Sequence, residues 1–192
     1  MLVLASTSGH RKALLKRLGL PFEAVPPEVD ETPRRGEEPH ELAARLAQAK
    51  AEAVAARYPG SIVIGSDQVA IRDGTMLGKP GTAAEARRQL EGSSGHPLEF
   101  LTAVCILDGR SGDVEPYLHM DITRVQFRPL LEAEIDRYLE REQPWDAAGS
   151  FYSEGLGISL VERIDSLDPT GLVGLPLIWV AGMLRQLGLE AP

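Results

Sequence analysis

An apolar run in the middle of the chain, from Ser61 to Gly65, sets the tightest limit on how the chain can fold. Its residues Ile62, Val63 and Ile64 are β-branched, and the pair Pro59-Gly60 ends whatever precedes them. Such a run is typical of a strand that is buried on both faces. A strand of this kind needs helices on both sides of its sheet, so we expect an α/β fold.

Helices and strands are predicted to alternate on either side of this run. Apolar residues that recur at helical spacing predict helices over residues 9–18, 40–57, 83–91, 131–141 and 175–187. Strands are expected at residues 2–5, 22–25, 98–108, 114–127 and 158–162, and the two long ones are expected to pair as antiparallel neighbours across a turn at 108–112. The sheet should therefore be mixed. No repeat or linker marks a boundary, so one domain is expected over residues 1–192.

The composition limits the partners of the chain. It has 20 Lys and Arg against 28 Asp and Glu, a formal net charge of −8, which argues against a nucleic-acid partner. No apolar stretch approaches the ~18 residues of a membrane span, and no leader-like segment opens the sequence, so we expect no membrane contact and a cytoplasmic location. The one cysteine, Cys105, lies in an apolar run and is expected to be a buried hydrophobe.

Asp67 comes just after the central apolar run and is followed by Gln68. Ligand crevices of α/β folds form at the carboxyl ends of strands. A carboxylate at this place can bind a metal ion or act as a base, although a solvated or helix-capping Asp would give the same local pattern.

Two lysines stand in positions that favour a role with an anion. Lys50 follows Leu42 and Leu46 at four-residue steps, so it borders the apolar face of its predicted helix, where it can either snorkel to solvent or point inward. Lys79 follows Gly78 as in a phosphate-binding P-loop, but Pro80 stands where that loop has Ser or Thr. A P-loop is therefore rejected, and a single phosphate-facing lysine remains open.

The turn between the first strand and the first helix is polar, from Ser6 to Lys12. Hydroxyls, backbone N–H groups and two cations make such a turn a good anion cradle. Simple N-capping by Ser8 explains the same residues equally well.

A loop too rich in Pro and Gly for regular structure is predicted over residues 26–39, and it contains the carboxylate pair Asp30-Glu31. Oxygen ligands of this kind can hold Mg²⁺, although acidic loops are commonly just solvated.

Together these segments resemble the Maf family of nucleoside triphosphate pyrophosphatases, and the resemblance runs from Leu2 to about Leu187. It is carried by six blocks in order: Ala5-Ser6-Thr7-Ser8 with Arg11-Lys12 and Leu14-Leu15, Val29-Asp30-Glu31-Thr32, Leu46-Ala47 with Lys50-Ala51, Ile64-Gly65-Ser66-Asp67-Gln68-Val69, Leu77-Gly78-Lys79-Pro80 and Val173-Gly174-Leu175-Pro176-Leu177.

The resemblance implies an inosine-triphosphate-pyrophosphatase-like fold, with a twisted mixed sheet, flanking helices and two lobes around a cleft. It also implies a divalent cation, Mg²⁺ or Mn²⁺, and often a homodimer. We expect Asp67 to be the proton acceptor, Glu31 and Asp67 to hold the metal, and Lys50 and Lys79 to act with Asp67 in catalysis. The residues expected to bind the substrate or select it are Ser6, Ser8, His10, Arg11, Lys12, Gln68 and Glu154.

Within that family, residues 148–158 and 168–174 resemble the branch that acts on 7-methyl-GTP. The first turn departs from the pattern of that branch at Gly9, His10 and Lys12. We therefore predict a pyrophosphatase that hydrolyses 7-methyl-GTP, or a related modified nucleotide, to the monophosphate and diphosphate. Two alternatives stay open: a dTTP or UTP pyrophosphatase of the same family, and a non-catalytic nucleotide-binding regulator of cell division.

Overall fold

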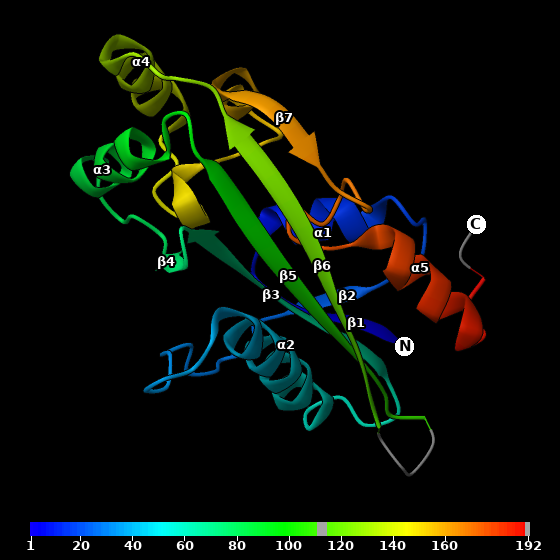
Figure 1. The fold of residues 1–192 in the computed structure, drawn as a ribbon. Coiled ribbons are helices and arrows are strands. Elements are labelled where there is room, and N and C mark those ends of the chain that lie inside the picture. Colours follow the sequence, from blue (N-terminus) through cyan, green and yellow to red (C-terminus); the bar gives the residue numbers. More distant parts are fainter. Residues whose placement is uncertain (111–114, 191–192) are drawn as a thin grey trace. The chain divides into compact units, whose positions relative to one another are not determined.

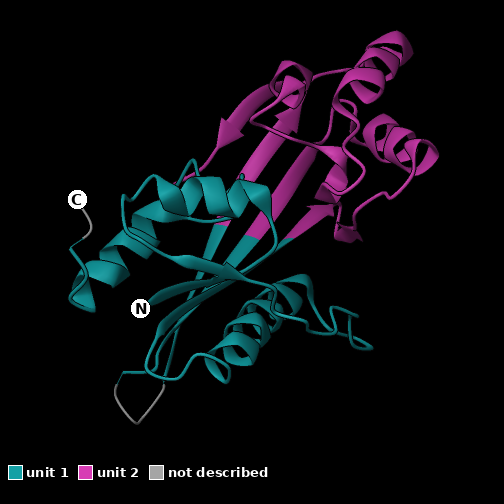
Figure 2. Cartoon of the chain, turned by 180° about the vertical axis from the view of Figure 1, so that it is seen from behind, with its two compact units in different colours: residues 1–68, 102–121, 168–192 teal, residues 69–101, 122–167 magenta. Residues whose placement is uncertain are grey.

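The computed structural model describes residues 1–110 and 115–190 (Figure 1). It divides into two compact units, which Figure 2 colours separately. Unit 1 comprises residues 1–68, 102–121 and 168–192, and unit 2 comprises residues 69–101 and 122–167. The expected turn at 108–112 falls partly outside the described residues. A single domain and a cleft between two lobes both stay predictions.

The described residues form a seven-stranded sheet with the order β2-β1-β3-β5-β6-β7, to which β4 adds as a partner of β3. The strands are β1 (Leu2–Ala5), β2 (Glu23–Val25), β3 (Ile62–Arg72), β4 (Thr75–Leu77), β5 (Pro97–Asp108), β6 (Pro116–Phe127) and β7 (Val161–Asp165). β1 pairs in parallel with β2 and β3, whereas β4 and β7 pair antiparallel with β3 and β6. β6 runs back beside β5 in the opposite direction (Figure 1). The predicted mixed sheet is confirmed.

The helices are α1 (Gly9–Lys16), α2 (Pro39–Ala55), α3 (Ala83–Ser93), α4 (Glu132–Glu142) and α5 (Leu177–Gln186), with short 3₁₀ turns at Ala148–Ser150 and Leu156–Leu160. All five lie where apolar periodicity predicted a helix, and the α/β class is confirmed. In the described part of the chain, no helix has the length and apolar character needed to cross a membrane.

The two faces of the sheet in unit 1 follow from the alternation of side chains along a strand. Leu2 and Leu4 of β1 and Ile62 and Ile64 of β3 point to one face and form a core cluster. That cluster includes the buried leucines of α1 and α5, which cover this face (Figures 1 and 2). Residues of opposite parity in β3 point to the other face, where α2 packs.

Gly65 lets α2 pack directly on β3. A Cβ at this position would lie 2.7 Å from the backbone nitrogen of Ala51 and would also collide with the carbonyl oxygen of Ala47. Both residues are fully buried in α2. Only glycine therefore permits the close approach of this helix to the strand.

The strand predicted to end at Gly65 continues to Arg72, which corrects the sequence-based boundary. Asp73 and Gly74 follow with φ values of 47° and 75°. Positive φ at both central residues is the signature of a type I′ hairpin turn, and it joins β3 to the unpredicted strand β4. β4 pairs with the last three residues of β3, Ala70 to Arg72.

The prediction of a strand at residues 158–162 was wrong for its first three residues. Leu156–Leu160 form a 3₁₀ turn, and β7 begins at Val161. The hydroxyl of Ser159 donates to the carbonyl oxygen of Leu156 at 2.8 Å. Local hydrogen bonds of this kind compete with the hydrogen bonds between strands, so these residues form a turn and pairing with β6 starts only after it.

The close packing at Gly65 yields a stability prediction. We expect Gly65→Ala to lower the free energy of unfolding by about 3 kcal/mol or more, because the backbone of α2 must move to admit the methyl group. Urea unfolding measures the effect. Gly9→Ala is the matched control, since a Cβ there meets nothing within 4 Å. Equal stability of the two variants would contradict the packing described for α2.

Candidate functional site

Asp67 lies within β3, not after it, which corrects the sequence-based placement. The parallel pairing of β1 with β3 ends at the partners Ala5 and Gly65, and Asp67 stands two residues farther along. Asp67 is thus just past the carboxyl end of the parallel pair, although its own strand continues. The alternation of the strand points its side chain to the face that α2 covers.

Lys50 meets Asp67 on that face. Its ammonium group lies 2.6 Å from Oδ1 of Asp67 and 2.7 Å from Oε1 of Glu31. Lys50 is 5% exposed and Asp67 is 8% exposed, so both charges are largely removed from water. Buried charges are tolerated only when they are paired, and this lysine pairs with two carboxylates at once. Of the two readings left open for Lys50, the inward one is confirmed.

The loop that carries Glu31 is fixed by Arg45 of α2, which the sequence analysis did not single out. Its Nη2 donates to the carbonyl oxygen of Thr32 at 3.2 Å, and its guanidinium binds Glu37 at 2.5 and 2.8 Å. The hydrogen bonds that Arg45 donates to Glu37 raise the pKa of Arg45, and the carboxylates of Asp30 and Asp67 act in the same direction. Arg45 therefore holds Glu31's loop and adds positive charge near Asp67.

Arg11 brings a second cation into the field of the two carboxylates. Burial lowers the pKa of its guanidinium, while the charges of Asp67 and Glu31 oppose that shift. Its Nε donates to the carbonyl oxygen of Gly174 at 2.9 Å, and the buried hydroxyl of Ser66 contacts the same oxygen at 3.0 Å. The start of α1 is thereby tied to the segment that precedes α5.

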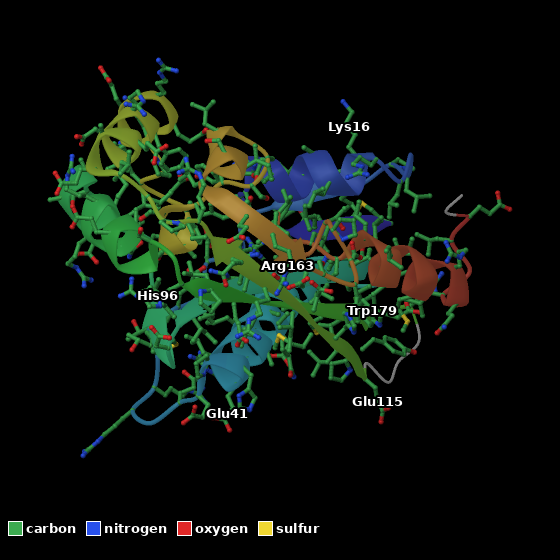
Figure 3. All side chains as sticks on the ribbon, turned by 45° about the horizontal axis from the view of Figure 1, so that its top comes forward. Lys16, Glu41, His96, Glu115, Arg163 and Trp179 are labelled. Carbon is green, nitrogen blue, oxygen red and sulfur yellow. The ribbon has the colours of Figure 1, made fainter. Side chains whose placement is uncertain are left out.

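The turn between β1 and α1 is built by its own hydroxyls. Ser6 is buried, and its Oγ accepts from the backbone nitrogen of Ser8. The Oγ of Ser8 accepts from the backbone nitrogen of Arg11 at 3.3 Å, so Ser8 is the N-cap of α1. His10 is exposed and Lys12 is partly exposed on the first turn of the helix. By contrast, Lys16 at the end of α1 points away from the protein (Figure 3).

Gln68 points to the opposite face from Asp67. Its amide nitrogen contacts Thr102 Oγ1 at 2.9 Å and the carbonyl oxygens of Gly171 and Leu172 at 3.2 and 3.0 Å. The side chain therefore holds the segment before α5. A role of Gln68 in substrate choice stays a prediction.

Lys79 and Glu154 both belong to unit 2. Both side chains are exposed in the structure. Their contribution to the site around Asp67 therefore stays a prediction, whereas Arg11, Glu31, Lys50 and Asp67 are brought together within unit 1.

A buried pair before α5 was noticed in the sequence only as part of a family block. Oδ1 of Asp168 accepts from the Thr170 hydroxyl at 2.6 Å, and Oδ2 accepts from the backbone nitrogen of Ile178 at 2.6 Å. The Thr170 oxygen in turn accepts from the backbone nitrogen of Leu177. These bonds satisfy free N–H groups at the start of α5. The signal was present as an acid and a hydroxyl just upstream of an apolar helix.

The carboxylates of Glu31 and Asp67 are oxygen ligands of the kind that a divalent cation takes, and a metal site formed by them stays a prediction. Among residues 1–110 and 115–190, no three His, Cys, Asp or Glu side chains gather as a metal site. The two carboxylates share one ammonium group, so their oxygens lie within reach of a common point. Mg²⁺ is commonly held by one or two carboxylates, with waters and substrate phosphates as its other ligands.

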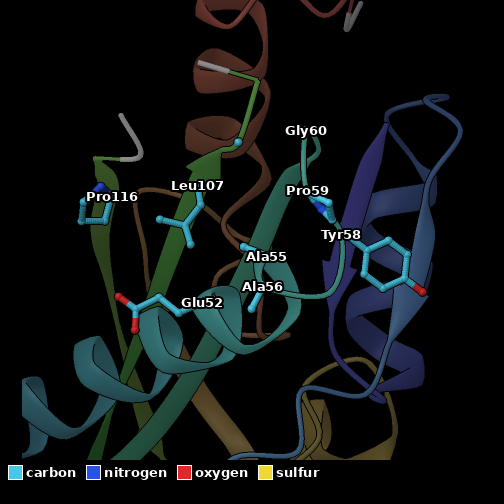
Figure 4. A pocket seen from close by; sticks show the side chains of 9 residues that line it. Glu52, Ala55, Ala56, Tyr58, Pro59, Gly60, Leu107 and Pro116 are labelled. Carbon is cyan, nitrogen blue, oxygen red and sulfur yellow. The ribbon is translucent and has the colours of Figure 1, made fainter. Parts of the chain in front are cut away.

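A cavity of about 400 Å³ lies elsewhere in unit 1 (Figure 4). It is lined by Glu52, Ala55, Ala56, Tyr58, Pro59, Gly60, Leu107, Gly109 and Pro116. None of the predicted site residues contributes to it, and the described residues of its lining offer no cation for an anionic ligand.

Comparison with known proteins covers nearly the whole chain. Residues 1–187 match the family described as Maf-like protein. A 7-methyl-GTP pyrophosphatase of Bordetella avium is 53% identical over 98% of this chain and 94% of its own length. Another of the same name from Xanthomonas oryzae pv. oryzae is 55% identical over 100% of this chain and 98% of its own length. The matched residues include every predicted site residue.

Among solved structures, a HAM1 protein from Coxiella burnetii aligns with a TM-score of 0.45 at 19% identity, over 66% of this chain and 72% of that one.

The contact between Arg45 and Glu37 predicts a pH dependence. Hydrogen bonds from Arg45 and from the backbone of Arg34 lower the pKa of Glu37 to about 2, against about 4.3 in an unfolded chain. A lowered pKa in the folded state stabilises the protein above the unfolded value, and this contribution disappears as the pH falls toward 2. Relative to Glu37→Gln, the stability advantage of the natural protein should fall by about half between pH 5 and pH 3.

Thermal unfolding at stepped pH measures this advantage. In an Arg45→Met background, the difference in stability between the proteins with Glu37 and with Glu37→Gln should depend much less on pH, because the partner that lowers the pKa of Glu37 is gone. An advantage that stays constant down to pH 3 in the natural background would contradict the assignment.

Proposed function

Because the chain belongs to the Maf family, we propose that it is an enzyme that hydrolyses 7-methyl-GTP, or a closely related modified nucleotide, to the monophosphate and diphosphate. The observation that carries the proposal is the buried ammonium of Lys50 between Glu31 and Asp67. Two carboxylates held by one lysine at the end of a parallel strand pair supply both metal ligands and a base. The names of the relatives support the substrate.

Asp67 acts as the proton acceptor. Lys50 binds its Oδ1 and fixes the carboxylate, so that the carboxylate can orient a water molecule toward the α-phosphorus and take its proton. The bond between the α-phosphorus and its bridging oxygen to the β-phosphate then breaks, and diphosphate leaves. Because α2 and β3 hold the two side chains, the geometry is set before the substrate binds.

The cations near Asp67 are already paired with carboxylates, so they do not suffice to neutralise a triphosphate. Arg11 and Lys50 are balanced by Glu31 and Asp67, while Arg45 is bound to Glu37. A polyanion therefore requires further positive charge, which we assign to Lys12 on α1, to Lys79 of unit 2 and to a divalent cation. Charges aimed at the phosphates stabilise the negative charge that develops during bond breaking.

Glu31 and Asp67 would hold the cation, Mg²⁺ or Mn²⁺. When bound, it would neutralise phosphate charge and polarise the phosphorus centre. The backbone N–H groups at the start of α1, ordered by Ser6 and Ser8, would bind phosphate oxygens.

We assign the choice of base to His10, Gln68 and Glu154. An N7-methylated guanine carries a positive charge, which the carboxylate of Glu154 would favour over an unmethylated ring. The imidazole of His10 is exposed and offers a flat surface for the ring. The proposal includes action in the cytoplasm, as the composition of the chain leads us to expect, and a homodimeric state, as the family resemblance implies.

Release of diphosphate tests the proposal directly. With Mg²⁺ or Mn²⁺ present, the purified protein should cleave 7-methyl-GTP in preference to GTP, dTTP, UTP and CTP. Asp67→Asn should reduce turnover by about 10²- to 10⁴-fold, because it removes the proton acceptor.

Asp73→Asn is the matched control. It makes the same chemical change in the turn after β3, where Asn tolerates positive φ as well as Asp does. Preference for dTTP or UTP would move the assignment to the pyrimidine branch of the family. Nucleotide binding without turnover would favour the regulator, and unchanged turnover in Asp67→Asn would remove Asp67 from its role.

A further inference from the structure

Gln89 is a buried polar side chain in unit 2 that has no role in the mechanism proposed for the site around Asp67. It lies on α3 and is 3% exposed. Both ends of its amide are engaged: Nε2 donates to the carbonyl oxygen of Gly78 at 3.1 Å, and Oε1 accepts from the hydroxyl of Ser150 at 2.6 Å. A side chain that is paired at both ends in a dry environment fixes its two partners in place.

Each partner belongs to a segment that carries a predicted site residue. Gly78 directly precedes Lys79, and we call residues 78–81 the lysine loop. Ser150 stands four residues before Glu154, and we call residues 147–157 the glutamate segment. A second bond joins the lysine loop to the chain two residues before the glutamate segment, from the backbone nitrogen of Gly81 to the carbonyl oxygen of Trp145 at 2.9 Å.

The glutamate segment needs such support because its backbone is strained. Ser150 is fully buried with a φ of 58°, a left-handed conformation that is strained for a residue other than glycine. Its carbonyl oxygen accepts from the hydroxyl of Tyr138 at 3.2 Å, and that hydroxyl also accepts from the backbone nitrogen of Tyr152. Strained residues persist only where their surroundings hold them. Gln89 and Tyr138 hold Ser150 from two sides.

We propose that Gln89 is a positioning residue that fixes the position of the lysine loop relative to the glutamate segment. Its one amide group thereby holds in place both a phosphate-binding lysine and a base-selecting carboxylate. This inference rests on the proposed function. Because the two bonds use different atoms of Gln89, their effects on catalysis can be separated.

Three variants make the test. Gln89→Met keeps the length of the side chain and removes both bonds. Ser150→Ala removes only the bond to the glutamate segment. Ser93→Ala is the matched control, because its buried hydroxyl donates to the backbone oxygen of Gln89 at 2.7 Å and not to the side chain.

The readouts are kcat and KM for 7-methyl-GTP and GTP, with circular dichroism to verify folding. Ser150→Ala should lower the preference for 7-methyl-GTP over GTP by about 10-fold or more with little change in kcat, since a small displacement of Glu154 weakens its contact. Gln89→Met should show the same loss of preference and, in addition, a fall in kcat of about 10-fold or more for both nucleotides. Ser93→Ala should change neither the preference for 7-methyl-GTP over GTP nor kcat.

A folded Gln89→Met protein with natural kcat and natural preference would overturn the inference. If Gln89→Met does not fold, Ser150→Ala decides, and an unchanged preference in that variant would overturn the inference as well. A natural protein that releases no diphosphate would instead overturn the proposed function, and the inference with it, so the two failures are distinguishable.

Discussion

The ammonium group of Lys50, buried between Asp67 and Glu31, is the interaction on which the site depends. Removing a carboxylate and an ammonium from water is costly, and the cost is offset only by close pairing and further hydrogen bonds. Here the pairing distances are 2.6 and 2.7 Å. The same contacts join three parts of the chain: strand β3 through Asp67, helix α2 through Lys50 and the loop before α2 through Glu31. The chemistry and the local fold therefore use the same bonds.

Successive residues of β3 point to opposite faces of the sheet, and the residues on each face have different contacts. Asp67 points toward α2 and Lys50, whereas Ser66 and Gln68 point to the other face and bind the segment before α5. Gly65 makes this arrangement possible, since it lets α2 approach closely enough for Lys50 to reach the strand. One short sequence thus supplies the close packing, the carboxylate and the support for a loop on the opposite face.

Local patterns were enough to predict the helices and most strands, because these follow from apolar periodicity. For Lys50 they left snorkelling and an inward position both open, and only the contact with Asp67 decides between the two. The continuation of β3 through Asp67 was missed, although Asp73-Gly74 is a turn signal for the hairpin that stabilises it. The role of Arg45 could not be predicted, because its partners Thr32 and Glu37 lie in a loop without periodicity and bind it through side-chain and carbonyl groups. The joint support of Lys79's loop and Ser150 by Gln89 depends on contacts between residues far apart in sequence, which no local pattern encodes.

A double-mutant cycle on Lys50 and Asp67 tests the central claim most directly. The free energy of unfolding is measured by urea for the natural protein, Lys50→Met, Asp67→Asn and the double variant. We expect Lys50→Met alone to lose about 3 kcal/mol, because it leaves buried negative charge unpaired. The double variant should recover about 2 kcal/mol of that loss, since no Asp67 charge then remains to be compensated. A double variant as unstable as the sum of the two single variants would show that the pair is not coupled and would contradict the account.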